Sequence, residues 1–272
     1  NPSAGTQQRR LRNADRNALQ PCHFARGIEG RLVADGDDFI HHRAVEDFRH
    51  VFTGGFTLYK DNTQLSAAYS YGTERDYRSQ SITISAGTDF LQRNTQITLA
   101  YARGFDEVCN AAFAPTLDPT VRARLDSSDG CFTSAVDRQE QDIDLDNFQA
   151  AWTQSWTPVF TTQLVLTGSI QHGFLGNPYR GVVIGAGGQI AQEHHPENRA
   201  RGAVAVRAKY YVREIEMAFG AGARVYRDTW DLWSQTYELD IERYIFPWFR
   251  LQGRGRFYTQ TAAPFWSNDY TG

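Results

Sequence analysis

Hydrophobic and polar side chains alternate along most of this chain. The stretch 63–72 shows the alternation best, because Leu65, Ala67, Tyr69 and Tyr71 fall at every second position and small or polar residues lie between them. Side chains of a strand point alternately to the two faces of a sheet, so this period predicts strands with one apolar face. Ten strands are expected, at about 45–60, 63–74, 77–90, 94–104, 142–156, 160–172, 199–212, 215–226, 232–245 and 248–260.

Short and long connections alternate between these strands. The tight turns are Asp61-Asn62, Arg93-Asn94, Thr157-Pro158, Arg213-Glu214 and Phe246-Pro247, and the longer links are 73–78, 105–141, 173–198 and 227–231. Outer-membrane barrels have short periplasmic turns and longer extracellular loops. The pattern therefore predicts an all-β fold, an antiparallel up-and-down transmembrane β-barrel. Segments 1–43, 105–141 and 173–198 would be its long extracellular parts.

The loop pattern also bears on the ends of the chain. The first predicted strand would descend from segment 1–43, and the last would rise back to the same extracellular side. Barrels of this type keep both termini in the periplasm. We therefore expect residues 1–272 to be a single barrel domain that is partial at both ends, with twelve or more strands in the complete protein.

Composition agrees with such a barrel. The mean hydropathy is −0.52 and aromatic residues make up 13%. No run of 18 apolar residues exists, which excludes a transmembrane helix in this sequence. Strands that alternate lipid-facing and lumen-facing side chains are polar on average and rich in aromatics. The formal net charge of −3 gives no reason to expect nucleic acid as a partner.

Charged residues of the last strands share one predicted face. Unpaired charges that face lipid cost about 2–4 kcal/mol each at the bilayer midplane, so this face must line a lumen. The predicted lumen-lining residues are Arg207, Lys209, Glu216, Arg224, Glu238, Asp240, Glu242, Arg250, Arg254 and Arg256. Two interpretations remain open: a pore lining that senses charge, or a ladder of ion pairs that fills a narrow barrel.

Large aromatic residues lie near the ends of the predicted strands. Amphipathic rings favour the boundary between lipid and water. We therefore predict an aromatic girdle of Trp152, Trp156, Trp230, Trp233, Trp248 and Tyr258. The alternative is that these rings are ordinary core aromatics.

Two of the three cysteines lie in one long polar segment. An oxidising compartment favours a disulfide between Cys109 and Cys131 and leaves the role of Cys22 open. In the chain-entropy model, closing a loop of this size contributes about 3 kcal/mol. The alternative is three unpaired thiols.

The sequence offers no convincing catalytic or metal site. Asp142, Asp144 and Asp146 lack the glycine and the bidentate glutamate of an EF-hand loop, and are more simply the wet face of a strand. The pairs His41-His42 and His194-His195 would point to opposite sides of a strand. We therefore expect no enzyme, no metal and no cofactor.

Four segments of the C-terminal half carry a resemblance to a known family. They are Gly173-Phe174-Leu175-Gly176-Asn177-Pro178-Tyr179-Arg180, His195-Pro196-Glu197-Asn198-Arg199-Ala200-Arg201, Tyr226-Arg227-Asp228-Thr229-Trp230-Asp231-Leu232 and Arg256-Phe257-Tyr258-Thr259-Gln260-Thr261-Ala262-Ala263-Pro264-Phe265. Their order and spacing resemble a family of Gram-negative outer-membrane β-barrels catalogued as domain of unknown function 3570. The resemblance covers about 150–265 and implies an outer-membrane location, but no activity and no binding residues.

The expected function is that of a porin-like channel with a charged lumen in the bacterial outer membrane. The alternative is a structural barrel component of a multi-protein envelope complex, with the long loops as a docking surface or plug. Partners would be outer-membrane lipid and other envelope proteins that bind the extracellular loops. The fold alone does not decide between these functions, and it does not identify a solute.

Overall fold

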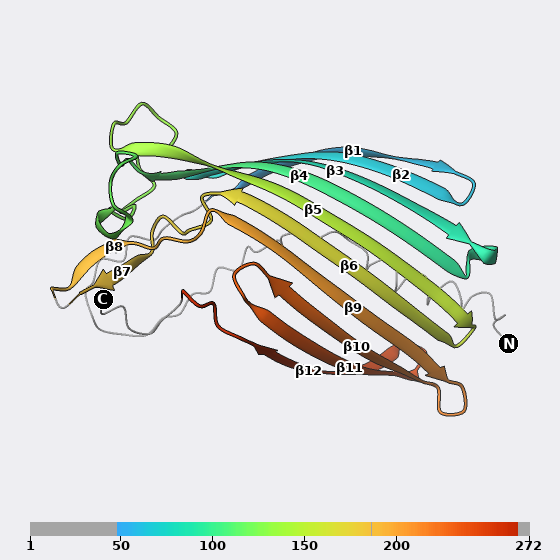
Figure 1. The fold of residues 1–272 in the computed structure, drawn as a ribbon. Helices are drawn as coiled ribbons and strands as arrows, with labels where there is room; N and C mark the ends of the chain where they lie inside the picture. Colours follow the sequence, from blue (N-terminus) through green and yellow to red (C-terminus); the bar gives the residue numbers. More distant parts are fainter. Residues whose placement is uncertain (1–47, 186, 266–272) are drawn as a thin grey trace. The chain divides into compact units, whose positions relative to one another are not determined.

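The computed structural model describes residues 48–185 and 187–265. These form one ten-stranded sheet and a separate two-stranded hairpin (Figure 1). The strands are β1 (His50–Lys60), β2 (Thr63–Thr73), β3 (Tyr77–Phe90), β4 (Thr95–Ala111), β5 (Arg138–Thr157), β6 (Phe160–Gly173), β7 (Gly181–Ile184), β8 (Gln189–Gln192), β9 (Asn198–Val212), β10 (Met217–Asp228), β11 (Trp233–Phe246) and β12 (Phe249–Gln260). Two short 3₁₀ segments are η2 (Leu91–Arg93) and η3 (Pro119–Val121). None of the described residues forms a helix long and apolar enough to cross a bilayer.

Strand order in the large sheet follows the chain. The order is β1-β2-β3-β4-β5-β6-β9-β10-β11-β12, and every neighbouring pair is antiparallel. Only the β7–β8 hairpin interrupts the sequence, and it forms its own small sheet. The prediction of an all-β antiparallel sheet of about ten strands is therefore confirmed. Among the described residues, β1 and β12 are the two ends of the order and do not pair with each other.

Two of the predicted loops contain more structure than the sequence indicated. Strand β4 continues to Ala111 and β5 begins at Arg138, and these two residues pair, so the sheet extends into the predicted 105–141 loop. The predicted 173–198 loop contains the β7–β8 hairpin. These extensions were missed because their charged and amide side chains do not alternate with apolar ones. Segment 1–43 and the predicted extra strands lie outside the described residues.

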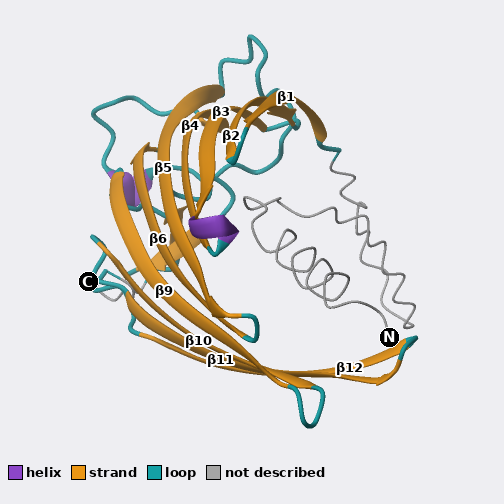
Figure 2. Cartoon of the chain, turned by 90° about the vertical axis from the view of Figure 1, so that its right-hand side faces the viewer, coloured by secondary structure: helices purple, strands orange, loops and turns teal. Residues whose placement is uncertain are grey.

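The sheet curls across its width (Figure 2). Its two faces differ in polarity, as β3 illustrates. In β3, Ile82 and Ile84 are each 48% exposed. Thr83 and Ser85, which point to the other face, are half-buried. A curled sheet shelters its concave face, so the polar face is the concave one and the apolar face is convex. Hydroxyl groups also pair across strands on the concave face, as in Thr53–Ser70 at 2.9 Å.

Gly173 ends β6 at the point where the chain leaves the sheet. Its φ of +111° lies in a region that L side chains rarely adopt. A Cβ at this position would collide with the backbone carbonyl oxygen of Asp142. The Gly173 amide donates to the Glu197 carbonyl at 2.9 Å, and the Phe174 amide donates to the Asp142 carbonyl at 3.0 Å. Both the backbone angle and the space therefore require glycine here.

Replacing Gly173 by alanine should lower the free energy of unfolding by about 1–3 kcal/mol, because a Cβ strains the backbone and pushes β5 away. Gly168→Ala in the same strand is the matched control, because a Cβ there meets its nearest atom only at 3.9 Å. Denaturant unfolding of the detergent-solubilised protein measures both. Equal stabilities of the two variants would contradict the assigned strain.

Candidate functional site

The concave face of β9–β12 carries a dense set of charged side chains, which we call the charged wall. The pairing register brings Glu238 opposite Arg256 and Asp240 opposite Arg254. The same register places nine of the ten predicted lumen-lining residues on this one face: Arg207, Lys209, Arg224, Glu238, Asp240, Glu242, Arg250, Arg254 and Arg256. The structure therefore brings together, across four strands, residues that are up to 49 positions apart in the sequence.

Two glycines of β10 allow the charges to reach across this wall. Gly222 lies between Arg207 on β9 and Glu238 on β11 in the register, and these two side chains pair over it at 3.8 Å. The carboxylate of Asp240 lies where a side chain of Gly220 would project. Because β10 has no side chains at these positions, side chains of β9 and β11 can meet above it although the two strands are not adjacent.

Ion pairs in the charged wall are loose and solvent-exposed. Glu238 also pairs with Arg256 at 3.7 Å, and Glu242 pairs with Arg250 at 3.3 Å. The three arginine side chains in these pairs are 47–59% exposed. Exposed ion pairs contribute at most about 1 kcal/mol each, so they do not lock the wall into one arrangement.

The tenth predicted residue, Glu216, does not belong to the wall. It lies in the turn between β9 and β10 with a φ of +53°, because β10 begins only at Met217. The sequence prediction extended the alternation of β10 too far toward the turn. Glu216 must therefore be removed from the predicted lumen lining.

A compact cluster at the long-loop end of β9 and β10 forms the rim of the charged wall. Its centre is Asp228, whose side chain is fully buried. One carboxylate oxygen accepts the Trp230 and Leu232 amides, both at 3.0 Å. The other accepts the Tyr226 hydroxyl at 2.7 Å and the Arg199 guanidinium at 2.6 Å. The buried charge is thus fully hydrogen-bonded, which offsets its desolvation.

Trp230 packs against the other side chains of the same rim cluster. The His195 ring stacks on it with centroids 5.4 Å apart, Phe265 meets it edge-on, and the Arg199 guanidinium lies 4.1 Å from its centroid. Its indole N–H donates to the Asn198 carbonyl at 3.0 Å. Trp230 is only 9% exposed. Its assignment to an aromatic girdle is therefore wrong, because stacking and a hydrogen bond hold it inside the rim.

The rim cluster is also where the segments that carried the family resemblance meet. His195, Trp230 and Phe265 come from three of these segments. The fourth segment lies beside His195, because a Cβ at Gly176 would lie 3.5 Å from the His195 Nδ1 atom. Sequence reasoning missed this cluster, because its members are loop residues with no periodic pattern. Their spacing indicated a family but not a shared location.

The long loops 112–137 and 174–197 fold together into a second cluster, which we call the loop cap. The predicted disulfide between Cys109 and Cys131 is present, and Leu125 is buried against it. The Leu125 amide donates to the Pro178 carbonyl at 2.7 Å, which ties the first loop to the second. The disulfide therefore closes a packed unit and not a free loop.

A buried amide pair attaches the loop cap to the sheet. Gln192 of β8 donates to the Asn110 side chain of β4 at 2.6 Å, and both residues are almost fully buried. Asn110 is at a position of β4 whose side chain points to the concave face. The β7–β8 hairpin thus lies on the concave side of the sheet, at the end where the long loops emerge (Figure 1).

The other predicted girdle residues divide between the two faces. Trp152, Trp156 and Trp233 point to the convex face, and Trp248 lies in the exposed turn between β11 and β12. Tyr258 lies instead on the concave face, the same face as Arg256 two positions earlier, and its hydroxyl donates to the Gln260 side chain. Tyr258 was misassigned because strand ends reveal position along a strand but not its face.

Charged side chains border the apolar band of the convex face near the long-loop end. Arg103 pairs with Asp144 at 2.9 Å and also with Asp146. These contacts account for two of the three acids considered as a cation site, and the described residues hold no group of three or more potential metal ligands. From Asp146 to Trp156 the strand advances ten residues. At about 3.3 Å per residue and a tilt of roughly 40°, this corresponds to a band about 25 Å high.

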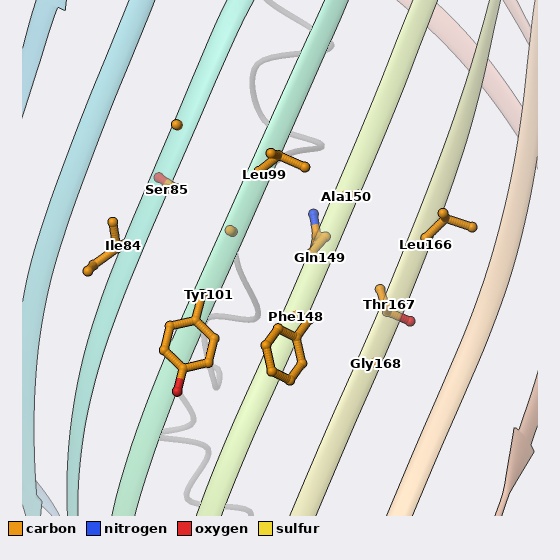
Figure 3. A pocket seen from close by; sticks show the side chains of 12 residues that line it. Ile84, Ser85, Leu99, Tyr101, Phe148, Gln149, Ala150, Leu166, Thr167 and Gly168 are labelled. Atoms are coloured by element: carbon orange, nitrogen blue, oxygen red, sulfur yellow. The ribbon is translucent and has the colours of Figure 1, made fainter.

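A shallow hollow of about 630 Å³ also lies on the convex face. Figure 3 shows Ile84, Leu99, Tyr101, Phe148 and Leu166 around it. The small residues Ala86, Ala150 and Gly168 also line it. The hollow is almost entirely apolar and lies on the face opposite to the charged wall. It is therefore part of the apolar band and separate from the charged wall.

His195 gives the rim cluster a testable pH dependence. Burial lowers the pKa of its imidazole below the ordinary 6.5, and the Glu193 carboxylate offsets this in part. The folded rim favours neutral His195, so its stabilisation is present above pH 6.5 and is lost as the pH falls from there toward the lowered pKa. Between pH 7.5 and 5, the unfolding midpoint of His195→Gln should fall less than that of the wild type. His194→Gln, an exposed neighbour, should behave as the wild type; three identical pH profiles would contradict the assignment.

Comparisons with known proteins agree with the fold. The structure resembles the siderophore receptor PirA from Acinetobacter baumannii with a TM-score of 0.52 and 8% identity, over 76% of this chain and 33% of the receptor. The chain thus spans about a third of the receptor's length, and at this identity the likeness concerns the fold alone. No curated protein matches the sequence. Residues 37–271 match the family described as "Protein of unknown function (DUF3570)", and the chain belongs to this family.

Proposed function

We propose that this chain forms most of a closed β-barrel in the bacterial outer membrane and acts there as a porin-like channel with a charged lumen. One observation carries the proposal: the ten-stranded sheet has a continuous apolar convex face that no element of the described residues covers. Leu99 is 56% exposed on this face, and Leu239, five strands away in the sheet, is 66% exposed. A soluble sheet buries such a face against a second layer, and soluble monomers rarely expose a large apolar patch.

The borders of the apolar face support a membrane location. The paired charges around Arg103 lie toward the long-loop end, and Trp156 and Trp248 lie toward the short turns. The band between them matches the roughly 25 Å apolar belt of outer-membrane barrels. Likeness to an outer-membrane receptor barrel favours the same compartment, and the disulfide fits an oxidising one.

The concave face supports a water-filled interior. It carries hydroxyl and amide groups on β1–β6 and charges on β9–β12, and these groups need water or each other as partners. Ion pairs of the charged wall leave their arginines about half exposed, which fits a hydrated lumen better than a packed one. Of the two interpretations of the charged residues, we therefore favour a pore lining over a filled barrel.

The full-length protein, purified in detergent and inserted into a planar bilayer, should produce stable single-channel current steps. Heat-modifiable migration on gels verifies beforehand that the barrel is folded. A folded, inserted protein that passes no ions would contradict the channel.

A second candidate is a structural component of an envelope complex, and the loop cap favours it. Val183 and Ile190 on the β7–β8 hairpin are 58% and 56% exposed, so this hairpin offers an apolar surface to another envelope protein. The same cap lies on the concave side and would narrow the mouth of a barrel.

Outer-membrane lipid is the proposed partner of the convex face. The absence of an enzymatic activity and of nucleic-acid partners stays a prediction.

Opening the disulfide separates the two roles of the loop cap. The double variant Cys109→Ser with Cys131→Ser should loosen the cap and raise the single-channel conductance, because the folded cap becomes about 3 kcal/mol less stable relative to its unfolded loop. Cys22→Ser serves as the control. An unchanged conductance in the double variant would show that the cap does not limit the current and would favour docking as its role.

A further inference from the structure

We propose that the charged wall makes the channel selective for anions, so that small anionic solutes such as inorganic phosphate and short carboxylates are its substrate class. This inference rests on the proposed channel function and adds to it the sign of the transported charge. It is carried by the balance of charges on the concave face, by their pairing, and by the neutrality of the opposite wall.

Basic side chains outnumber acidic ones on the concave face of β9–β12. The basic residues are Arg199, Arg201, Arg207, Lys209, Arg224, Arg250, Arg254 and Arg256, and the acidic residues are Asp228, Glu238, Asp240 and Glu242. Eight positive charges thus face four negative ones. The chain as a whole has a net charge of −3, so this excess is a local feature and does not reflect composition.

Ion pairs do not cancel this excess of positive charge. Glu238 is shared between Arg207 and Arg256, so one acid serves two bases. Arg224 lies between Ala205 and Thr236 in the register and is exposed, and it has no ion pair among the described residues. Arg224 therefore adds a positive charge to the concave face that no carboxylate of the described residues pairs with.

The opposite wall does not compensate for this charge. On the concave face of β3 and β4, acids occur only at the two ends: Asp89 beside the short turn and Asp106 near the loop cap. Asp106 is engaged by the Tyr77 hydroxyl. Between them lie serine, threonine, glutamine, alanine and glycine. A solute in the lumen would therefore meet a basic wall on one side and a neutral polar wall on the other.

The size of the effect follows from screened electrostatics. One unpaired charge about 7 Å from an ion in water changes its energy by roughly one RT, and the Debye length is about 10 Å at 0.1 M salt and 3 Å at 1 M. We therefore expect a chloride-to-potassium permeability ratio above about 3 at 0.1 M, falling toward 1 at high salt.

Reversal potentials of the full-length protein in a planar bilayer, under a KCl gradient centred on 0.1 M, test the inference. The double variant Arg224→Gln with Arg254→Gln removes two positive charges from the concave face and should lower the permeability ratio at least twofold. The matched control is Arg227→Gln with Arg243→Gln, because these two arginines point to the convex face of β10 and β11. The control should leave the ratio unchanged.

Each outcome separates the inference from the proposal beneath it. Anion preference in the wild type that weakens in the concave variant alone supports the basic wall. Ion current with a permeability ratio of 1 or below at 0.1 M would overturn the inference and leave the channel intact. Equal effects of the concave and convex variants would also overturn it. A folded, inserted protein without current would contradict the channel itself.

Discussion

The fixed register of ten antiparallel strands is the constraint on which the other features depend. Backbone hydrogen bonds hold each strand against its neighbours, so a period-2 sequence pattern becomes two continuous faces. A slip of one residue in any pair would move the apolar set of that strand to the polar side. The apolar band, the charged wall and the separation between them all follow from this alignment.

The middle of the strands and their long-loop end differ in the kind of side-chain contacts that they make. The middle of each strand supplies one apolar and one polar side chain per step, which suits a wall between lipid and water. At the long-loop end, buried polar contacts replace the alternating pattern: the Asp228 carboxylate organises the rim cluster by accepting five hydrogen bonds, and the Asn110–Gln192 pair anchors the loop cap. These buried polar groups fix the loops in a way that hydrophobic patterning could not.

The sequence predicted most of the fold, because alternation and turn chemistry are local signals. It placed strands such as 77–90 and 160–172 almost at their observed bounds. It also placed nine charged residues on one face, since parity follows directly from position. It failed for residues placed by other signals: Glu216 lies in a turn beyond the strand, Trp230 is buried among loop residues, and Tyr258 was assigned from its place near a strand end although it points to the concave side. The rim cluster depends on contacts between loops far apart in the chain, and no local pattern records them.

Spin labels can test directly whether the convex face contacts lipid. Labels placed singly at positions 82–85 of β3, in protein reconstituted into liposomes, report whether oxygen dissolved in lipid or a water-soluble nickel complex reaches each site. We expect oxygen dissolved in lipid to reach labels at positions 82 and 84, and the water-soluble nickel complex to reach labels at positions 83 and 85. Water access at all four positions would contradict a membrane-spanning sheet.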